Sequence, residues 1–369
     1  MTKEPISKNQ LLNVSNHYII TKQRSGSTLL GLILGNSIDS QVIHEENIYY
    51  KFKEKYNLRI FDNITVVDEF ITEFFSYSTH AGVSNQLPNK EKLKVLLTPY
   101  LEYQLNFKHF CNLFYQFFFS AQETKKITTI VNKDIIYHVS VEEIHRDSPN
   151  SKFVFLIRDS VSNINSCINA NFGSSNVVGQ TYVWNNLMED IVYSTTKLPC
   201  DNFIIVKFEE LIKDTHATVS LICNFLGIPF HVSMLNNQNA AKKIYDYAKE
   251  RYRERNNTGA VPKENIIHSS SRGEIDKDKL TKNNFSDNEI KKIIYLTNKF
   301  RKKFDYTSNS RNWKHIFLLT PIDLFAYLKI RIQLGIVKYY FHSNFYRKVF
   351  FRRINIFNLF NSRIKIKTT

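Results

Sequence analysis

A short polar loop, residues 21–28 (TKQRSGST), has the composition of an anion-binding turn. It joins an apolar run to a Leu/Ile-rich segment that is expected to be helical. A small-residue loop that enters a helix presents successive backbone N–H groups to an anion. Its side chains add hydroxyl donors and one fixed positive charge. The candidate binding residues of the loop are Arg24, Ser25, Gly26, Ser27 and Thr28. The loop predicts a phosphate- or sulfate-binding site, although an ordinary capped turn uses the same residue types.

A second candidate site follows the apolar run at residues 153–157. Arg158 comes directly after this expected strand, and Ser166 lies eight residues later, in an expected helix. Ligands of open α/β sheets bind outside the carboxyl ends of the strands. The pair is therefore suited to hold one phosphate together. The alternative is that Arg158 pairs with a surface acid and Ser166 faces solvent.

Five β-branched or aromatic runs predict the strands that would position these residues. They are residues 17–22, 41–44, 127–132, 152–157 and 203–208. Almost continuously apolar runs are typical of buried parallel strands. Helices are expected between them, at residues 29–34, 138–145, 160–171 and 218–226. This alternation predicts an α/β fold of three layers, with a central parallel sheet flanked by helices.

Two further segments accompany the predicted sheet. Residues 50–124 are aromatic-rich and predict a helical insert within a first domain of residues 1–306, and residues 240–256 and 287–304 predict further helices. Residues 307–369 differ, because they hold 12 Lys and Arg and a single acid, Asp323. Basic residues interleaved with aromatic ones suit an interfacial helix on an anionic bilayer. The alternative is a helical tail that packs on the first domain.

The overall charge favours anionic partners. The 369 residues include 50 Lys and Arg against 34 Asp and Glu, a net charge of +16. Nucleotides, sulfated or phosphorylated ligands and anionic membrane surfaces fit this balance, whereas no nucleic-acid reader motif is present. The four cysteines are widely spaced, so neither a metal site nor a disulfide framework is expected. No apolar run approaches the ~20 residues of a spanning helix, and a cytoplasmic location is expected.

Four motifs in order resemble the sulfotransferases that use 3′-phosphoadenosine 5′-phosphosulfate (PAPS). They are QRSGSTL at residues 23–29, HEE at 44–46, NKDI at 132–135, and the segment 148–166 with its FVFLIRD core. The similarity is to the branch with the tyrosylprotein sulfotransferases and many bacterial sulfotransferases, and it spans roughly residues 19–306 outside the insert. Two departures stand out, because Ile135 replaces a usual proline and Ser160 replaces a helix-entry residue.

The resemblance implies a P-loop-like fold and assigns roles to individual residues. It implies that residues 24–28 hold the 5′-phosphosulfate of PAPS, that Arg158 and Ser166 hold the 3′-phosphate, and that Ser271 lies near the sulfate. Lys133 would neutralise the departing phosphate together with Arg24. Glu46 would be the base that takes the acceptor's proton, with Glu45 as the alternative. No metal is implied.

The leading hypothesis is a PAPS-dependent transferase that sulfates a hydroxyl of a carbohydrate or a lipid-linked glycan. A protein-tyrosine sulfotransferase is the alternative within the class. A degenerate nucleotide-binding protein that docks on membranes through its basic tail is the alternative from another class. A P-loop kinase is disfavoured, because the GxxxxGK[ST] pattern is missing. The expected location is cytoplasmic, in part peripheral on the inner face of the membrane.

Overall fold

The computed structural model describes residues 6–44, 46, 48–78, 88–119, 127–134, 141–172, 174–236, 284–306 and 320–341. Several sequence predictions fall outside these ranges. They are the candidate residues Glu45 and Ser271, the departure at Ile135, the helix at residues 240–256, and the tail beyond residue 341.

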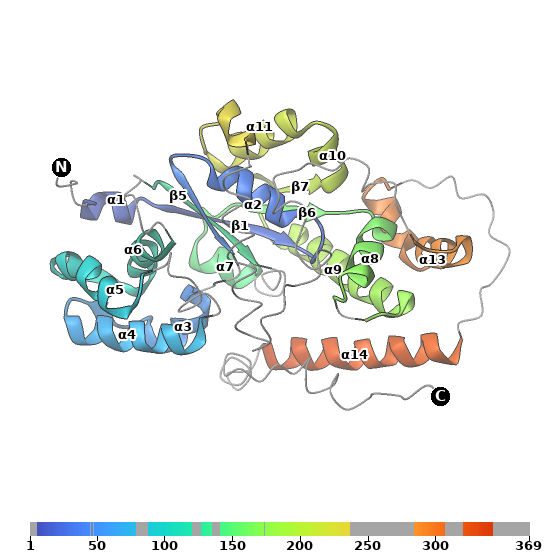
Figure 1. Ribbon diagram of the computed structural model, residues 1–369, viewed down its shortest axis with the longest axis horizontal. Coiled ribbons are helices and arrows are strands. Elements are labelled where there is room, and N and C mark those ends of the chain that lie inside the picture. The colour runs from blue at the N-terminus through green and yellow to red at the C-terminus, as the bar shows by residue number, and fades with distance from the viewer. Residues whose placement is uncertain are drawn as a thin grey trace, which may run out of the picture.

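A five-stranded parallel sheet forms the centre of the molecule, as the sequence predicts (Figure 1). Its spatial order is β2 (Ser40–His44), β5 (Thr129–Asp134), β1 (Ser15–Thr21), β6 (Phe153–Ile157) and β7 (Phe203–Lys207). Ile19 of β1 lies opposite Lys133 on one side and Val154 on the other. Because all strands are parallel, the loops that leave β1, β5 and β6 emerge at the same edge of the sheet.

Helices cover both faces of the sheet and complete three layers (Figure 1). One face carries α2 (Ser27–Gly35), α10 (Phe208–Lys213) and α11 (Thr215–Leu226). The other carries α7 (Val141–Asp147), α9 (Val177–Lys197) and α13 (Asp287–Lys303), with α8 (Ser160–Asn169) beside them. Ile19 and Ile20 enter opposite cores, as successive strand residues must.

One long helix was not predicted. The sequence of α9 includes Gly179, Thr181 and paired asparagines, which have lower helix propensity than alanine or leucine. Tertiary packing decides its structure, since Trp184, Leu187 and Ile191 fill the core against the sheet.

The insert is helical, as predicted, and its aromatic core also takes in Ile43 of β2 and Ile130 of β5. It contains α3 (Ile48–Tyr56), α4 (Ile64–Tyr77), α5 (Lys90–Leu97), the 3-10 turn η1 (Thr98–Tyr103) and α6 (Phe107–Phe119). Buried aromatic rings pack tightly there: the Phe61 and Phe110 ring centroids lie 3.7 Å apart. A two-stranded antiparallel sheet, β3 (Ile60–Phe61) with β4 (Leu105–Asn106), was not predicted, because two-residue strands carry no periodic signal. The short helix α1 (Lys8–Leu12) also contributes Leu11 to this core.

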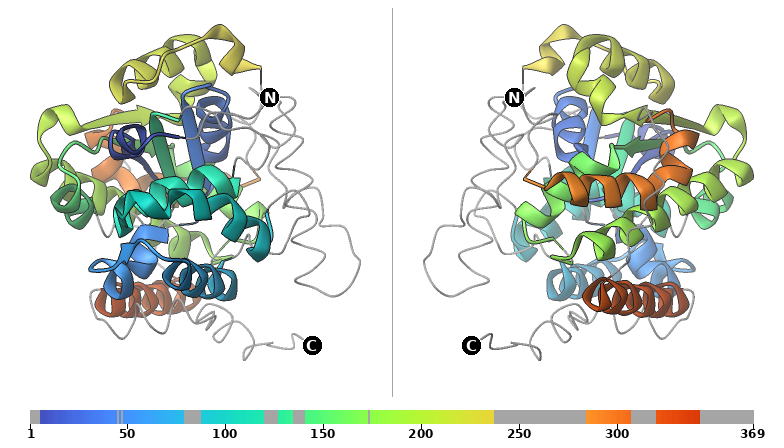
Figure 2. Two further views of the ribbon diagram at one scale, coloured as in Figure 1. Left: turned by 90° about the vertical axis from the view of Figure 1, so that its left-hand side faces the viewer. Right: turned by 90° about the vertical axis from the view of Figure 1, so that its right-hand side faces the viewer.

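The last described element is α14 (Pro321–Phe341), which lies against α9 at the lower side of the molecule (Figures 1 and 2). Among the described helices, none combines the length and the apolar character that crossing a bilayer requires.

The stability of the sheet should depend on the protonation of His17 in β1. This side chain is buried, and its Nδ1 accepts a hydrogen bond of 3.1 Å from the Lys152 N–H. Burial, followed by the charge of Lys152, lowers the pKa of His17 from 6.5 to about 4. The unfolded state therefore binds this proton at a higher pH than the folded state. The contribution to stability is complete above pH 6.5 and falls as the pH drops toward 4.

We expect the wild type to lose about 2.5 kcal/mol of unfolding free energy through this group between about pH 7 and pH 4.5. Urea unfolding curves at the two pH values measure the loss. His17→Gln cannot take up the proton, so it should show a correspondingly flatter pH dependence. An equal slope for the wild type and the variant would assign the pH dependence to other groups.

Candidate active site

The polar loop after β1 and the residue after β6 lie at the same edge of the sheet, because Thr21 pairs with Leu156. The loop bends through two left-handed residues, Arg24 at φ 66° and Gly26 at φ 90°. Gly26 is the N-cap of α2, and a Cβ there would lie 2.2 Å from the ring of Phe208. Only glycine combines this conformation with so close an approach. Ser25 and Ser27 are buried, and Ser27 and Thr28 begin α2.

The structure brings Arg24, Arg158 and Ser166 together. Arg158 donates a hydrogen bond from Nη1 to the backbone oxygen of Arg24 at 2.9 Å. Arg24 in turn donates from Nε to Ser166 Oγ at 3.0 Å. The Arg158 guanidinium also lies over the ring of Phe208, 4.6 Å from its centroid. Residues that the resemblance assigns to two different phosphates of PAPS therefore form one connected cluster.

The electrostatics of this cluster favour an anionic ligand. Burial lowers the pKa of Arg24, and the neighbouring charge of Arg158 lowers it further. Burial also lowers the pKa of Arg158, while the carboxylate of Glu209 opposes that shift. Both guanidinium groups stay protonated, since their ordinary pKa lies far above 7. An anion bound between them would relieve the like-charge repulsion and replace lost hydration.

Helix α8 braces the loop from the side. Asn163 donates from Nδ2 to the Gln23 backbone oxygen at 3.0 Å and to Ser25 Oγ at 3.1 Å. Its Oδ1 accepts a hydrogen bond of 2.9 Å from the buried ammonium of Lys22, which also reaches Gln180 Oε1 at 3.4 Å. These contacts hold the backbone of the loop in one conformation. Sequence analysis included Lys22 in the loop without assigning it a role, and it did not identify Asn163 or Gln180.

A signal for Asn163 is present in the sequence. Asn163, Ser166 and Cys167 stand at i, i+3 and i+4 of α8, so they share one face of that helix. Because Ser166 is a candidate site residue, this spacing predicts that Asn163 and Cys167 also face the site. Cys167 does contact the loop, since its sulfur lies 3.1 Å from Lys22 Nζ.

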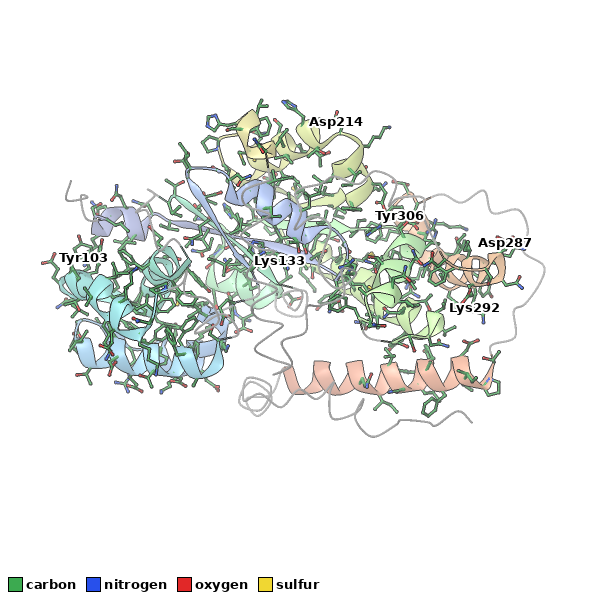
Figure 3. The ribbon with its side chains drawn as sticks, viewed as in Figure 1. Tyr103, Lys133, Asp214, Asp287, Lys292 and Tyr306 are labelled. Atoms are coloured by element: carbon green, nitrogen blue, oxygen red, sulfur yellow. The ribbon has the colours of Figure 1, made fainter. Side chains whose placement is uncertain are left out.

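A second layer of contacts fixes the start of α8. Asp159 caps this helix by accepting hydrogen bonds from the N–H groups of Val161 and Ser162, and it also binds the guanidinium of Arg301 from α13. The Asp159 N–H donates to Glu209 Oε1 at 3.0 Å. Tyr306 (Figure 3) donates to the other oxygen of Glu209 at 3.0 Å. Burial raises the pKa of Glu209, while these hydrogen bonds lower it. The environment of Arg158 is thus built partly by α13 and the residues that follow it.

The candidate catalytic residues lie at the ends of the two neighbouring strands. Lys133 is the fifth residue of β5, is buried, and lies opposite His44, the last residue of β2 (Figure 3). Glu46 lies two residues after the end of β2, and its buried carboxylate lies 3.6 Å from Lys51 Nζ. The hydroxyl of Tyr115 donates to the Glu46 backbone oxygen at 3.0 Å. Glu46 and Lys133 therefore belong to the same edge of the sheet as the arginine cluster.

Comparisons with known proteins identify the family of this chain. A model of the sulfotransferase family matches residues 18–232. A Caenorhabditis elegans protein, named as a candidate protein-tyrosine sulfotransferase, is 28% identical over 123 residues, which are 32% of this chain and 47% of that protein. A Caenorhabditis briggsae protein of the same name is 28% identical over 113 residues, 29% of this chain and 40% of that protein. The chain thus spans about half the length of the curated relatives it matches, or less.

Two solved structures are also similar. The sulfotransferase domain of the Synechococcus PCC 7002 olefin synthase is 16% identical, with a TM-score of 0.47 over 83% of this chain and 98% of that one. The sulfotransferase domain of the curacin biosynthetic pathway is 19% identical, with a TM-score of 0.47 over 80% and 98%. The family model carries the assignment, because it covers more than half of the chain and includes the loop, Lys133, Arg158 and Ser166. This chain belongs to the sulfotransferase family.

Proposed function

We propose that this protein transfers the sulfuryl group of PAPS to a hydroxyl of an acceptor. The observation that carries the proposal is the contact of Arg24 with both Arg158 and Ser166 at the carboxyl edge of the sheet. PAPS is a polyanion with phosphate at both its 3′ and 5′ positions. The buried guanidinium of Arg158 and the half-buried one of Arg24, backed by hydroxyl donors and a helix N-terminus, match such a ligand chemically. Membership of the sulfotransferase family supports the same donor.

The donor would be held by two sets of residues. The loop of residues 24–28 would bind the 5′-phosphosulfate through its backbone N–H groups, its hydroxyls and the Arg24 side chain. Arg158 and Ser166 would bind the 3′-phosphate. The bracing of this loop by Asn163 supports the assignment, because preorganised donors stabilise developing charge without reorganisation during the reaction.

Two residues would act on the reacting groups. When bound, PAPS supplies the sulfuryl group and a phosphate leaving group. Glu46 would accept the proton of the acceptor hydroxyl, as a general base. Lys133 would place its positive charge against the negative charge that develops on the leaving group, and positioning would supply much of the remaining rate.

The proposal also concerns the chemical class of the acceptor. A carbohydrate or a lipid-linked glycan is the first candidate, and peptidyl tyrosine is the second. The similarity to Caenorhabditis proteins named for tyrosine sulfation favours the second. Transfer of labelled sulfate from PAPS to matched panels of glycans, glycolipids and tyrosine peptides tests both. Absence of transfer together with absence of binding to 3′-phosphoadenosine 5′-phosphate (PAP) would refute the function itself.

A cytoplasmic location is part of the same proposal. All four cysteines are free thiols, and three of them are buried. Free thiols persist in reducing compartments, which supports this location. Fractionation of cells that express the full chain tests it.

Removal of the Arg158 or Ser166 side chain should weaken PAP binding. Arg158→Ala loses a charge-assisted hydrogen bond, so we expect a cost of about 2 kcal/mol, or roughly 30-fold in Kd. Ser166→Ala should also weaken binding, because Arg24 loses the hydroxyl that orients it. Titration calorimetry measures both. Arg146→Ala, an exposed arginine in α7, is the control that should bind normally. Normal affinity in both site variants would refute the assignment.

Replacement of the candidate base should separate turnover from binding. Glu46→Gln keeps the size of the side chain and removes the proton acceptor, so turnover should fall about 10²- to 10⁴-fold while PAP affinity stays near normal. Lys133→Ala should reduce turnover at least as much, because its charge acts in the transition state. Exposed Glu54 of α3 offers the matched control, Glu54→Gln. An active Glu46→Gln with an inactive Glu45→Gln would move the base to Glu45.

Arg301 should act as a positioning residue. Arg301→Gln leaves the Asp159 carboxylate at the start of α8 without its cationic partner, so PAP affinity should fall several-fold and thermal stability should decrease. Arg301→Lys restores the charge and should recover part of the affinity. A purely structural role would lower stability in both variants without any change in PAP binding by the folded protein.

A further inference from the structure

One face of α14 packs firmly on the catalytic domain. Ala326 and Ile330 are buried, and Ile330 lies beside Gly179 of α9. The ring of Tyr327 meets that of Tyr182 edge to face, with centroids 4.9 Å apart. This face of α14 is therefore committed to α9 and cannot serve another partner.

A buried acid fixes the rotation of α14 about its axis. The Asp323 carboxylate lies 2.7 Å from Nζ of Lys292 in α13 (Figure 3). It also accepts a hydrogen bond of 3.1 Å from Asn176, the N-cap of α9. Its carboxylate also accepts from the Thr320 N–H at 3.1 Å. Although burial raises the pKa of Asp323, these hydrogen bonds lower it to about 2, so the anchor is charged near neutral pH. The face opposite to Asp323 is consequently held outward.

That outward face carries an apolar stripe. Its residues are Leu324, Phe325, Leu328 and Ile332, which are 50%, 63%, 45% and 60% exposed. At 100° per residue they fall on one side of the helix, opposite Ala326 and Ile330. The same geometry places Lys329 along one border of the stripe and Arg331 along the other. A contiguous exposed apolar surface of this kind marks an interaction site rather than ordinary surface composition.

The charge of the sequence that follows α14 indicates the partner of the stripe. Residues 342–369 follow α14 directly and contain seven Lys and Arg with no Asp or Glu. A second copy of the chain would bring the same positive charge against this surface, so self-association through the stripe is disfavoured. An anionic surface that accepts apolar side chains satisfies both features, and a bilayer with anionic phospholipids is such a surface.

We propose that α14 docks the protein on anionic phospholipid bilayers, with the stripe inserted at the level of the head groups. Lys329 and Arg331 would lie at the phosphates on either side, their long stems along the apolar surface. The sulfotransferase domain would then be oriented by α14, because Asp323 and the packed face join the helix rigidly to α9 and α13. This inference does not depend on the identity of the donor or the acceptor.

Vesicle co-sedimentation of the full chain tests the proposal. The vesicles contain either phosphatidylcholine alone or phosphatidylcholine with phosphatidylglycerol. The stripe variant is Phe325→Asp/Ile332→Asp. Its matched control is Leu221→Asp/Val232→Asp, which makes the same charge change at exposed apolar residues of α11 and the turn η4 (Val232–Leu235) on the other side of the sheet. We expect the wild type and the control to sediment with anionic vesicles. The partition coefficient of the stripe variant should be lower than that of the wild type by about tenfold or more.

Two further variants separate the contributions of charge and of folding. Lys329→Gln/Arg331→Gln should reduce partitioning at low salt, and the difference from the wild type should shrink at high salt, because exposed charges are screened. Phe325→Gln removes the apolar ring without adding charge, so it reports on the stripe if the double aspartate variant has a reduced thermal midpoint.

Equal partitioning of the stripe variants and the control would overturn the proposal. Equal binding of the wild type to vesicles with and without phosphatidylglycerol would also overturn it. Light scattering tests the main alternative occupant of the stripe. A wild-type dimer that the stripe variant splits, without any binding to vesicles, would assign the stripe to a second copy of the chain and overturn membrane docking.

Discussion

The hydrogen bonds that join Arg158, Arg24 and Ser166 are the constraint on which the rest of the site depends. Arg158 donates to the backbone of Arg24, and the Arg24 side chain donates to Ser166, so the three residues form one connected cluster. A buried positive charge is costly unless nearby groups compensate it. The ring of Phe208 and the nearby Glu209 carboxylate compensate the charge of Arg158. The parallel sheet makes this arrangement possible, because adjacent strands β1 and β6 deliver both arginines to the same edge.

The loop between β1 and α2 adopts a conformation that it would not hold unaided. Arg24 occupies the left-handed region, which costs a non-glycine residue about 1–2 kcal/mol. Asn163 offsets this cost by binding the Gln23 backbone and Ser25 at once, and Lys22 donates a hydrogen bond to Asn163 Oδ1 in turn. The strain is therefore stored at the candidate anion site and stabilised by a neighbouring helix, an arrangement that is common where a ligand must meet preformed donors.

The insert and the sheet are joined at the candidate base. The hydroxyl of Tyr115, a residue of the aromatic core of the insert, accepts from the Ile48 N–H and donates to the Glu46 carbonyl. The position of Glu46 thus depends on packing among rings such as Phe110 and Phe114, which lie far from the reacting groups. Substitutions in that core would shift the backbone at Glu46 through its hydrogen bond with Tyr115.

Local patterns determined the parts of this protein that depend on short-range chemistry. The strand at residues 153–157 could be predicted because its apolar run has no alternation, and the anion site because small hydroxyl residues surround Arg24. The tertiary structure alone decided the strand order, the α9 helix and the partners of Asp159, which come from residues about fifty and about 140 positions away. Such contacts depend on how helices pack on a sheet. Residue type and local spacing do not predict them, because the partners are far apart along the chain. For the same reason the sequence indicated that the tail was basic and aromatic, whereas only the packing of Ala326, Ile330 and Asp323 decided which side of α14 faces outward.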